Sequence, residues 1–277
     1  MSSSRVTVAA RRPWWPALAG VVLVIVLSPV AWLVMMSLKT ELDALAMPPR
    51  LLFRPTLDNY AQLMDAKFLR PLGNSVAVAV STTVLSLALG VPAAYALSRA
   101  RIAAGGGVAL WILSTRMAPP IAFGIPFFLA YRSLGWLDTL GGLVLVHLGF
   151  NLSLVIWMMR TFFDAIPFSL EEAAYIDGAS VARAMLAVIL PLAGPGVIAT
   201  GILCFLQAWN DFFFALVLTR SEAMTAPVAI VNFMNYAGWD WGRITAGSVV
   251  VALPVLVFAW PVRRYLVSGL TAGATKG

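Results

Sequence analysis

Long stretches without a charged residue constrain this sequence more than any other feature. Four runs contain no Asp, Glu, Lys or Arg at all: 14–36, 71–98, 139–159 and 244–262. A helix needs about 20 apolar residues to cross the hydrocarbon core of a bilayer, so each run can hold one span. Since 61% of the residues are hydrophobic and only 11% are charged, a single soluble core could not bury this surface. The sequence therefore predicts a membrane protein.

Two further runs carry a single charge each, Arg116 within 102–131 and Asp211 within 184–219. Because backbone groups in lipid must be paired within the spanning segment, and these runs are long rather than alternating, helices are favoured over a β-barrel. The predicted fold class is all-α, a polytopic bundle of six transmembrane helices. The predicted spans are 14–36, 71–98, 106–131, 139–161, 191–219 and 244–262.

An even number of spans puts both ends of the chain on one side of the membrane. Ten Lys and Arg residues then flank the spans on the side of the termini, against eight on the other side. This excess predicts a cytoplasmic N-terminus (1–13), a transmembrane domain (14–268) and a cytoplasmic tail (269–277). The net charge of +7 is explained by this topology, and no nucleic acid partner is expected.

A polar insert, 162–190, interrupts the apolar runs on the same side as the termini. Ser169 to Glu172 matches the capping-box pattern, in which a hydroxyl at the N-cap and an acid three residues later satisfy the first free N–H groups. A short helix is therefore expected from Leu170. Gly178 predicts a bend after about two turns, and a second helix should lead to Leu190 and Pro191.

The insert resembles the "EAA" loop of permease subunits of binding-protein-dependent ABC importers. The matching positions are Glu172-Ala173-Ala174, Gly178 and Val188 to Pro191, with Val188 where the family has Ile. Resemblance to the carbohydrate branch of that family, and to the second permease of the maltose-type system, covers nearly the whole chain. It is carried by "NSVAVAVSTT" (74–83), "AAYALSR" (93–99), "STRMAPP" (114–120), "WNDFFFAL" (209–216), "TAPVAI" (225–230) and "GLTAGATKG" (269–277).

This resemblance implies that the transmembrane domain is a permease domain in a bacterial inner membrane. It implies ATP-driven import of a sugar or sugar alcohol by alternating access, with a disaccharide such as trehalose or a polyol such as mannitol or sorbitol as substrate. The implied partners are a second, homologous permease, two cytoplasmic ATPase subunits and a solute-binding protein outside the membrane. The insert becomes a coupling helix that docks on the ATPase. Its implied contact residues are Glu171, Glu172, Ala173, Ala174, Asp177, Gly178, Leu190 and Pro191. Tail residues Thr275, Lys276 and Gly277 are implied to contact the ATPase too, although a short tail can simply fray.

No nucleotide site is expected on this chain. It has only three lysines, Lys39, Lys67 and Lys276, and none lies in the G-x-x-x-x-G-K-[ST] pattern that cradles phosphates. ATP and its Mg²⁺ are therefore expected on the partner ATPase. Cys204 is the single cysteine, so neither an intrachain disulfide nor a cysteine metal site is encoded, and no metal ligand set is predicted. The chain is not expected to be an enzyme.

Polar residues within the apolar runs are candidates for a substrate pathway, because such groups are costly in lipid and usually face the bundle interior. Gln207, Asn210 and Asp211 are spaced to share one helix face, beside Trp209, and His147 and Asn151 share a face of the fourth span. Arg116 in the third span completes the set. The alternative is that these groups only bond between helices, with Arg116 as a counter-ion to Asp211.

Prolines predict kinks in two of the spans. Pro119, Pro120 and Pro126 interrupt the third run, and Pro191 and Pro195 lie at the base of the fifth. Two other classes of function remain open at this point. A secondary transporter would be expected to show inverted repeats, for which the sequence has no sign. A membrane enzyme would need a catalytic or metal cluster, and no such spacing is present.

Overall fold

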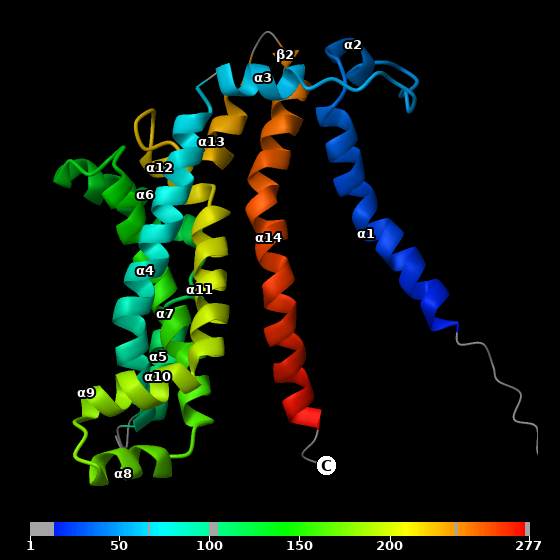
Figure 1. The fold of residues 1–277 in the computed structure, drawn as a ribbon. Helices are drawn as coiled ribbons and strands as arrows, with labels where there is room; N and C mark the ends of the chain where they lie inside the picture. Colours follow the sequence, from blue (N-terminus) through cyan, green and yellow to red (C-terminus); the bar gives the residue numbers. More distant parts are fainter. Residues whose placement is uncertain (1–13, 66, 100–104, 236–237, 275–277) are drawn as a thin grey trace, which may run out of the picture.

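The structure is a computed structural model of the 277-residue chain, and it describes residues 14–65, 67–99, 105–235 and 238–274. Nearly all of the regular structure in these residues is helical (Figure 1). The exception among them is a two-stranded antiparallel ribbon of β1 (Met234–Asn235) and β2 (Gly238–Trp239). The predicted all-α membrane fold is thus confirmed, with this ribbon as a small addition.

Four helices are each long and apolar enough to cross a membrane without a break. They are α1 (Trp15–Ser37), α4 (Leu69–Arg99), α7 (Leu140–Asp164) and α14 (Trp241–Ala274). Each coincides with a run that the sequence predicted to span. Their composition explains their length, since a helix satisfies its own backbone groups and these runs contain no charged residue.

The third predicted run, 106–131, is not one continuous helix. It forms α5 (Gly105–Ser114) and α6 (Pro120–Leu134), separated by a non-helical link. Pro119 has φ −65° and ψ 133°, an extended conformation, and Pro120 occupies the first turn of α6. The residue before a proline avoids helical geometry and proline lacks an N–H donor. The predicted interruption by proline is present, and the run 106–131 contains two helices in place of one.

The fifth predicted run is also bent. The helix α9 (Val181–Ala184) ends where this run, 184–219, begins. The run then contains the π-helical turn η1 (Met185–Ile189), α10 (Leu190–Leu192) and α11 (Gly194–Trp209). The axis turns by 78° between Val181–Leu192 and Gly194–Trp209. Pro191 and Pro195 remove backbone donors at this bend, as predicted. After α11 the chain breaks again before α12 (Phe213–Leu218), so 191–219 is not one helix either.

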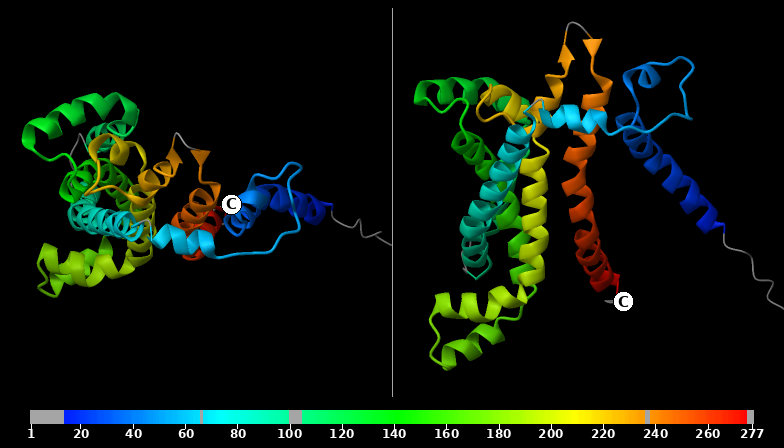
Figure 2. Two further views of the ribbon diagram at one scale, coloured as in Figure 1. Left: turned by 90° about the horizontal axis from the view of Figure 1, so that it is seen from above. Right: turned by 45° about the horizontal axis from the view of Figure 1, so that its top comes forward.

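The core of the bundle lies between α4, α7 and α11, where small residues allow close contact. A Cβ added at Gly90 would lie 2.6 Å from the Val155 side chain, and one at Gly196 would lie 2.5 Å from the ring of Phe162. Such glycines let membrane helices approach closely, where dispersion rather than hydrophobic exclusion holds them together. By contrast, α1 leans away from the bundle and meets α14 mainly near its C-terminal end (Figure 2).

The two ends of the bundle carry different elements (Figure 1). One end carries α2 (Glu41–Ala44), α3 (Asp58–Asp65), α13 (Ala226–Val231) and the ribbon. The opposite end carries α8 (Ser169–Ile176) and α9, together with the beginning of α1 and the end of α14. The polar insert therefore lies at the same end of the molecule as the beginning of α1 and the end of α14, in line with the span count.

Candidate functional site

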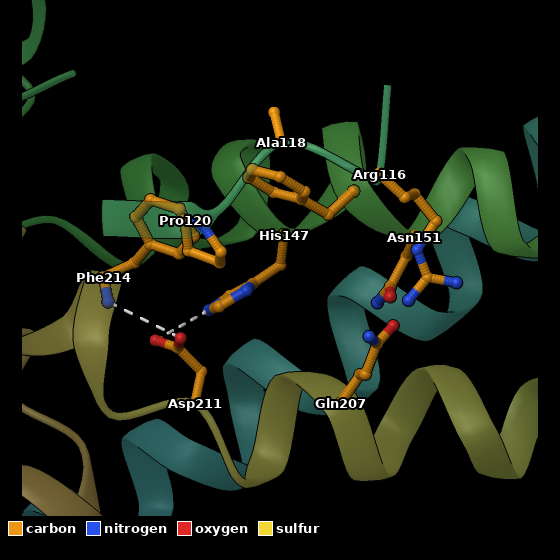
Figure 3. A pocket seen from close by; sticks show the side chains of 9 residues that line it. Arg116, Ala118, Pro120, His147, Asn151, Gln207, Asp211 and Phe214 are labelled. Atoms are coloured by element: carbon orange, nitrogen blue, oxygen red, sulfur yellow. Dashed lines mark hydrogen bonds and ion pairs between the residues drawn. The ribbon is translucent and has the colours of Figure 1, made fainter. Parts of the chain in front are cut away.

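A pocket opens among α7, α11 and the two helix breaks (Figure 3). It encloses about 550 Å³, including its open mouth, and brings together five of the seven predicted pathway residues. Its lining residues are Arg116, Ala118, Pro120, His147, Phe150, Asn151, Gln207, Asp211 and Phe214. Residues up to 95 positions apart in the sequence thus form one polar surface inside the bundle, between Arg116 and Asp211.

The helix breaks place the charged members of this pocket. Arg116 lies in the link between α5 and α6, and Asp211 lies in the link between α11 and α12. His147 and Asn151 are one turn apart on α7, so both face the same opening. Backbone that is not helical is tolerated within a membrane protein only where protein buries it or it lines a cavity. Both breaks meet this condition, because each contributes to the pocket wall.

The Asp211 side chain contacts both the first turn of α12 and His147 of α7. Its two carboxylate oxygens accept hydrogen bonds from the N–H groups of Phe214 (3.5 Å) and Ala215 (3.1 Å), which are free donors in the first turn of a helix. Oδ2 lies 3.6 Å from Nε2 of His147 (Figure 3). The titratable side chain nearest to Asp211 in the described residues is therefore His147, and the predicted Arg116 counter-ion contact is not formed.

Of the two predicted amides near the end of α11, Gln207 lines the pocket and Asn210 does not. The helix ends at Trp209, so Asn210 is its C-cap and Asp211 lies beyond the helix. Gln207 still shares the pocket with Asp211. Asn210 lines an adjoining, more open hollow together with these two residues.

Two other pathway candidates bond between helices. The Trp209 side chain is 2% exposed, and its Nε1 donates to the Val251 carbonyl of α14 at 2.9 Å, so it does not line the pocket. The Asn151 side chain does line it, but its Nδ2 also donates to the Cys204 carbonyl of α11 at 3.3 Å. Interhelical bonding, the alternative reading, thus holds fully for Trp209 and partly for Asn151.

At the other end of the molecule, α8 forms as a short helix followed by a bend. Gly178 has φ +82°, a left-handed conformation that glycine adopts without steric cost, so the predicted bend is confirmed. The predicted capping box is wrong. The helix begins at Ser169 itself, Phe168 is the N-cap, and no side chain caps it. Ser180 instead caps the next helix by accepting from the N–H of Arg183.

The coupling candidates divide into exposed and buried groups. The side chains of Glu172, Ala173 and Asp177 are exposed, as is Gly178, and they form the outer face of the loop. Glu171 is fully buried, so it does not belong to that face. Leu190 packs against the α4 and α7 core, while Pro191 is exposed. Thr275, Lys276 and Gly277 lie outside the described residues.

Comparison with known proteins places the chain in a family. A family model described as "Binding-protein-dependent transport system inner membrane component" matches residues 86–266. The chain belongs to this family. It is therefore a permease subunit of an ABC transport system, a multi-pass protein of the inner membrane that is not itself an enzyme. A secondary transporter is not favoured.

Several relatives of this permease are similar over nearly their whole length. The trehalose transport system permease protein SugB of Mycobacterium tuberculosis is 38% identical over 276 residues, covering 97% of this chain and 99% of that protein. The sulfoquinovosyl glycerol transport system permease protein SmoH of Agrobacterium fabrum is 36% identical, covering 94% and 92%. A crystal structure of a bacterial ABC transporter involved in the import of the acidic polysaccharide alginate matches with a TM-score of 0.75 and 29% identity, covering 90% and 94%.

Sequence reasoning missed the aromatic wall of the permease pocket. The Phe150 and Phe214 rings lie 5.3 Å apart between centroids and close one side of it, next to His147. Both residues lie in uniformly apolar runs, where nothing in the spacing distinguishes a ring facing a cavity from one facing lipid. The neighbouring polar positions, Asn151 and Asp211, were the available signal for Phe150 and Phe214.

Proposed function

We propose that this permease imports a carbohydrate, a disaccharide such as trehalose or a polyol such as mannitol or sorbitol, by ATP-driven alternating access. The observation that carries the proposal is the pocket at the two helix breaks. It places a guanidinium, a carboxylate, two amides and an imidazole beside aromatic rings. Sugars and polyols are recognised by directional hydrogen bonds from such groups, and an apolar wall orients them. The relatives named for trehalose and for a sugar glycerol support this class of substrate.

The pocket also suggests why the permease needs a second copy of its fold. Its mouth is open, so this chain alone does not enclose the pocket. We infer that a second, homologous permease supplies the other wall. A solute-binding protein would then deliver the substrate to the end of the bundle that carries α2, α3 and the ribbon. Two ATPase subunits would bind at the opposite end, where α8 presents Glu172 and Asp177.

The energy source follows from what the sequence lacks. With no phosphate-cradling loop in its 277 residues, the permease would depend on ATP and Mg²⁺ held by the ATPase subunits. Closure of the two ATPases on ATP would pull on α8 and switch the permease pair between inward-facing and outward-facing states. The beginning of α1 and the end of α14, which lie at the α8 end, would then face the cytoplasm.

Reconstitution tests this proposal. The permease, its partner permease, the ATPase and the solute-binding protein are placed in vesicles, and uptake of labelled trehalose, maltose, mannitol and sorbitol is measured with and without ATP. We expect uptake of at least one of these only when ATP and the binding protein are both present. Uptake that persists without the ATPase, or ATP-driven uptake of a substrate other than a sugar or polyol in place of these, would contradict the proposal.

A further inference from the structure

Glu171 is an unusual residue for a loop expected to face another protein. Its side chain is 0% exposed, whereas the adjacent Glu172 is exposed on the same helix. A buried carboxylate is costly unless it is paired and hydrogen-bonded. The surroundings of Glu171 therefore show which part of the fold compensates its charge.

The compensation comes from the C-terminal end of α4. Arg99 Nε donates to Glu171 Oε1 at 2.5 Å, and Tyr95 Oη donates to Oε2 at 2.6 Å. Within α8, Tyr175 Oη also donates to Oε2, at 3.3 Å. Both oxygens of the carboxylate are thus held, one of them by two hydroxyl groups and the other by a charged donor.

Arg99 extends the same connection to the link between α7 and α8. Its Nη2 donates to the Ile166 carbonyl at 3.2 Å, and its guanidinium lies 5.9 Å from the centre of the Phe168 ring and 6.0 Å from that of Tyr95. The Arg99 side chain is only 15% exposed, so this contact is shielded from water. Shielded, charge-assisted hydrogen bonds are short, directional and roughly twice as strong as neutral ones.

The rest of α8 is loosely attached. Leu170 and Ile176 are exposed, and its other packing is mainly against η1 and α9. Apolar contacts of this kind resist separation but have no fixed direction. The ion pair is therefore the contact that fixes the position of α8 relative to α4. In turn, α4 packs along α7 and α11, which carry His147, Asn151 and Gln207 of the pocket.

We propose that Glu171, Arg99 and Tyr95 form a mechanical link that transmits displacement of α8 to α4, and through α4 to the pocket. This inference rests on the proposed function, in which ATPase closure moves α8. It assigns Glu171 a role inside the permease and leaves docking to exposed residues such as Glu172. The residues of the link are positioning residues, since none of them touches the pocket. The backbone route from α8 through η1 to α11 remains when the link is cut, so cutting it lowers coupling without abolishing transport.

The test compares Glu171→Gln, Arg99→Gln and the double variant in the complete reconstituted transporter. The measured quantity is sugar taken up per ATP hydrolysed, together with the melting temperature of the complex. We expect each single variant to lower uptake per ATP about tenfold while ATP hydrolysis continues. The double variant should lose no more than either single variant, because all three cut one connection. Additive losses, or an unchanged ratio in all three, would overturn the proposal.

Two further variants keep the test decisive if a buried charge left alone prevents assembly. Tyr95→Phe removes one hydroxyl and keeps the ring, and Arg99→Lys keeps the charge but not the Nε donor. Both should assemble and lower uptake per ATP by a smaller factor, and unchanged ratios in both would also overturn the proposal. Asp43→Asn is the matched control, since it breaks an Arg50 ion pair at the opposite end of the molecule and should leave the ratio unchanged.

The two levels of failure are separable. If the unmodified transporter takes up no sugar with ATP and binding protein, the proposed function fails. If the unmodified transporter works and Glu172→Gln weakens ATPase binding, but the Glu171 variants keep a normal uptake per ATP, only the link fails.

Discussion

At the scale of single residues, Asp138 joins two loops through one carboxylate. It follows α6 in a left-handed conformation (φ +58°) and accepts from the N–H groups of Arg220, Ser221, Glu222 and Ala223. Burial alone raises the pKa of Asp138, but the four backbone donors outweigh burial and hold this pKa well below its usual range. The ionised form is therefore the one that stabilises this end of the fold.

Replacing Asp138 with Asn should destabilise the permease by about 1 to 2 kcal/mol at pH 7, since an amide has one acceptor oxygen and leaves backbone donors unpaired. A folded-state pKa below the unfolded value, about 3.9, means that the carboxylate contributes in full above pH ~4 and loses its contribution as the pH falls through the folded pKa. Melting temperatures in detergent from pH 3 to 7 measure this difference. Asp65→Asn, at an exposed position in α3, is the control, and an equal effect there would refute the role of Asp138.

Two neighbouring residues of α11 separate the pathway from the packing. Gln207→Ala removes an amide from the pocket, so we expect uptake to fall while the melting temperature hardly changes. Trp209→Phe removes the bond to the Val251 carbonyl and should cost about 1 kcal/mol of stability, with the relative uptake of different sugars unchanged. Uptake assays and thermal melts on both variants check this; a reversed pattern would show that Gln207 is structural.

At the scale of whole elements, Gly90 marks a point of close approach between α4 and α7. Gly90→Ala places a methyl group against Val155, so we expect a loss of roughly 1 to 3 kcal/mol from overpacking. Gly73→Ala in the same helix meets nothing within 4 Å and should stabilise α4 by about 0.5 to 1 kcal/mol. Thermal melts of the two variants in one detergent provide the comparison, and equal shifts would show that α4 and α7 are not closely packed at Gly90.

The elements also show what a sequence can predict here and why. Uncharged runs are long enough that α1, α4 and α7 could be located to within a few residues, since the length of a membrane span is set by the bilayer. The start of α14 was located equally well, but this helix continues beyond the predicted end at 262 to Ala274. Helix ends inside the apolar runs were not predictable in the same way. Proline marked the sites of disruption near Pro119 and Pro191, but whether a helix kinks, stops or restarts depends on the neighbours that satisfy its freed backbone groups.

The pocket was partly predictable for a related reason. A polar residue in a lipid-facing run must be compensated, so Arg116, His147, Asn151 and Asp211 could be selected from the sequence as a set. Which of these residues contact one another could not be predicted, because the spacing does not show whether Asp211 meets Arg116 or His147. The prediction that Glu171 contacts the ATPase was made for a side chain that is buried, for a different reason. Two consecutive acids on a helix point in different directions, and only tertiary packing decides which of them becomes buried.

At the scale of the whole molecule, the two ends should lie on opposite sides of the membrane. Cys204 is buried and should not react, so single cysteines can be introduced at Ile176 in α8 and at Leu52 at the other end, which are 86% and 95% exposed. With a membrane-impermeant thiol reagent, and with the ATPase subunits absent, we expect Ile176→Cys to react only in inverted vesicles. Leu52→Cys should react only in right-side-out vesicles, and the opposite result would reverse the proposed orientation.

The two helix breaks that meet at the pocket have a consequence for how such proteins diversify. Arg116 and Asp211 lie in short links, whereas the contacts that hold α4, α7 and α11 together lie elsewhere along those helices. A substitution at Arg116 can therefore change the groups offered to the substrate without repacking α4, α7 and α11, whereas Asp211 also holds the start of α12. Substrate specificity in such a permease can therefore change through a few substitutions while the helix bundle and the α8 loop stay the same.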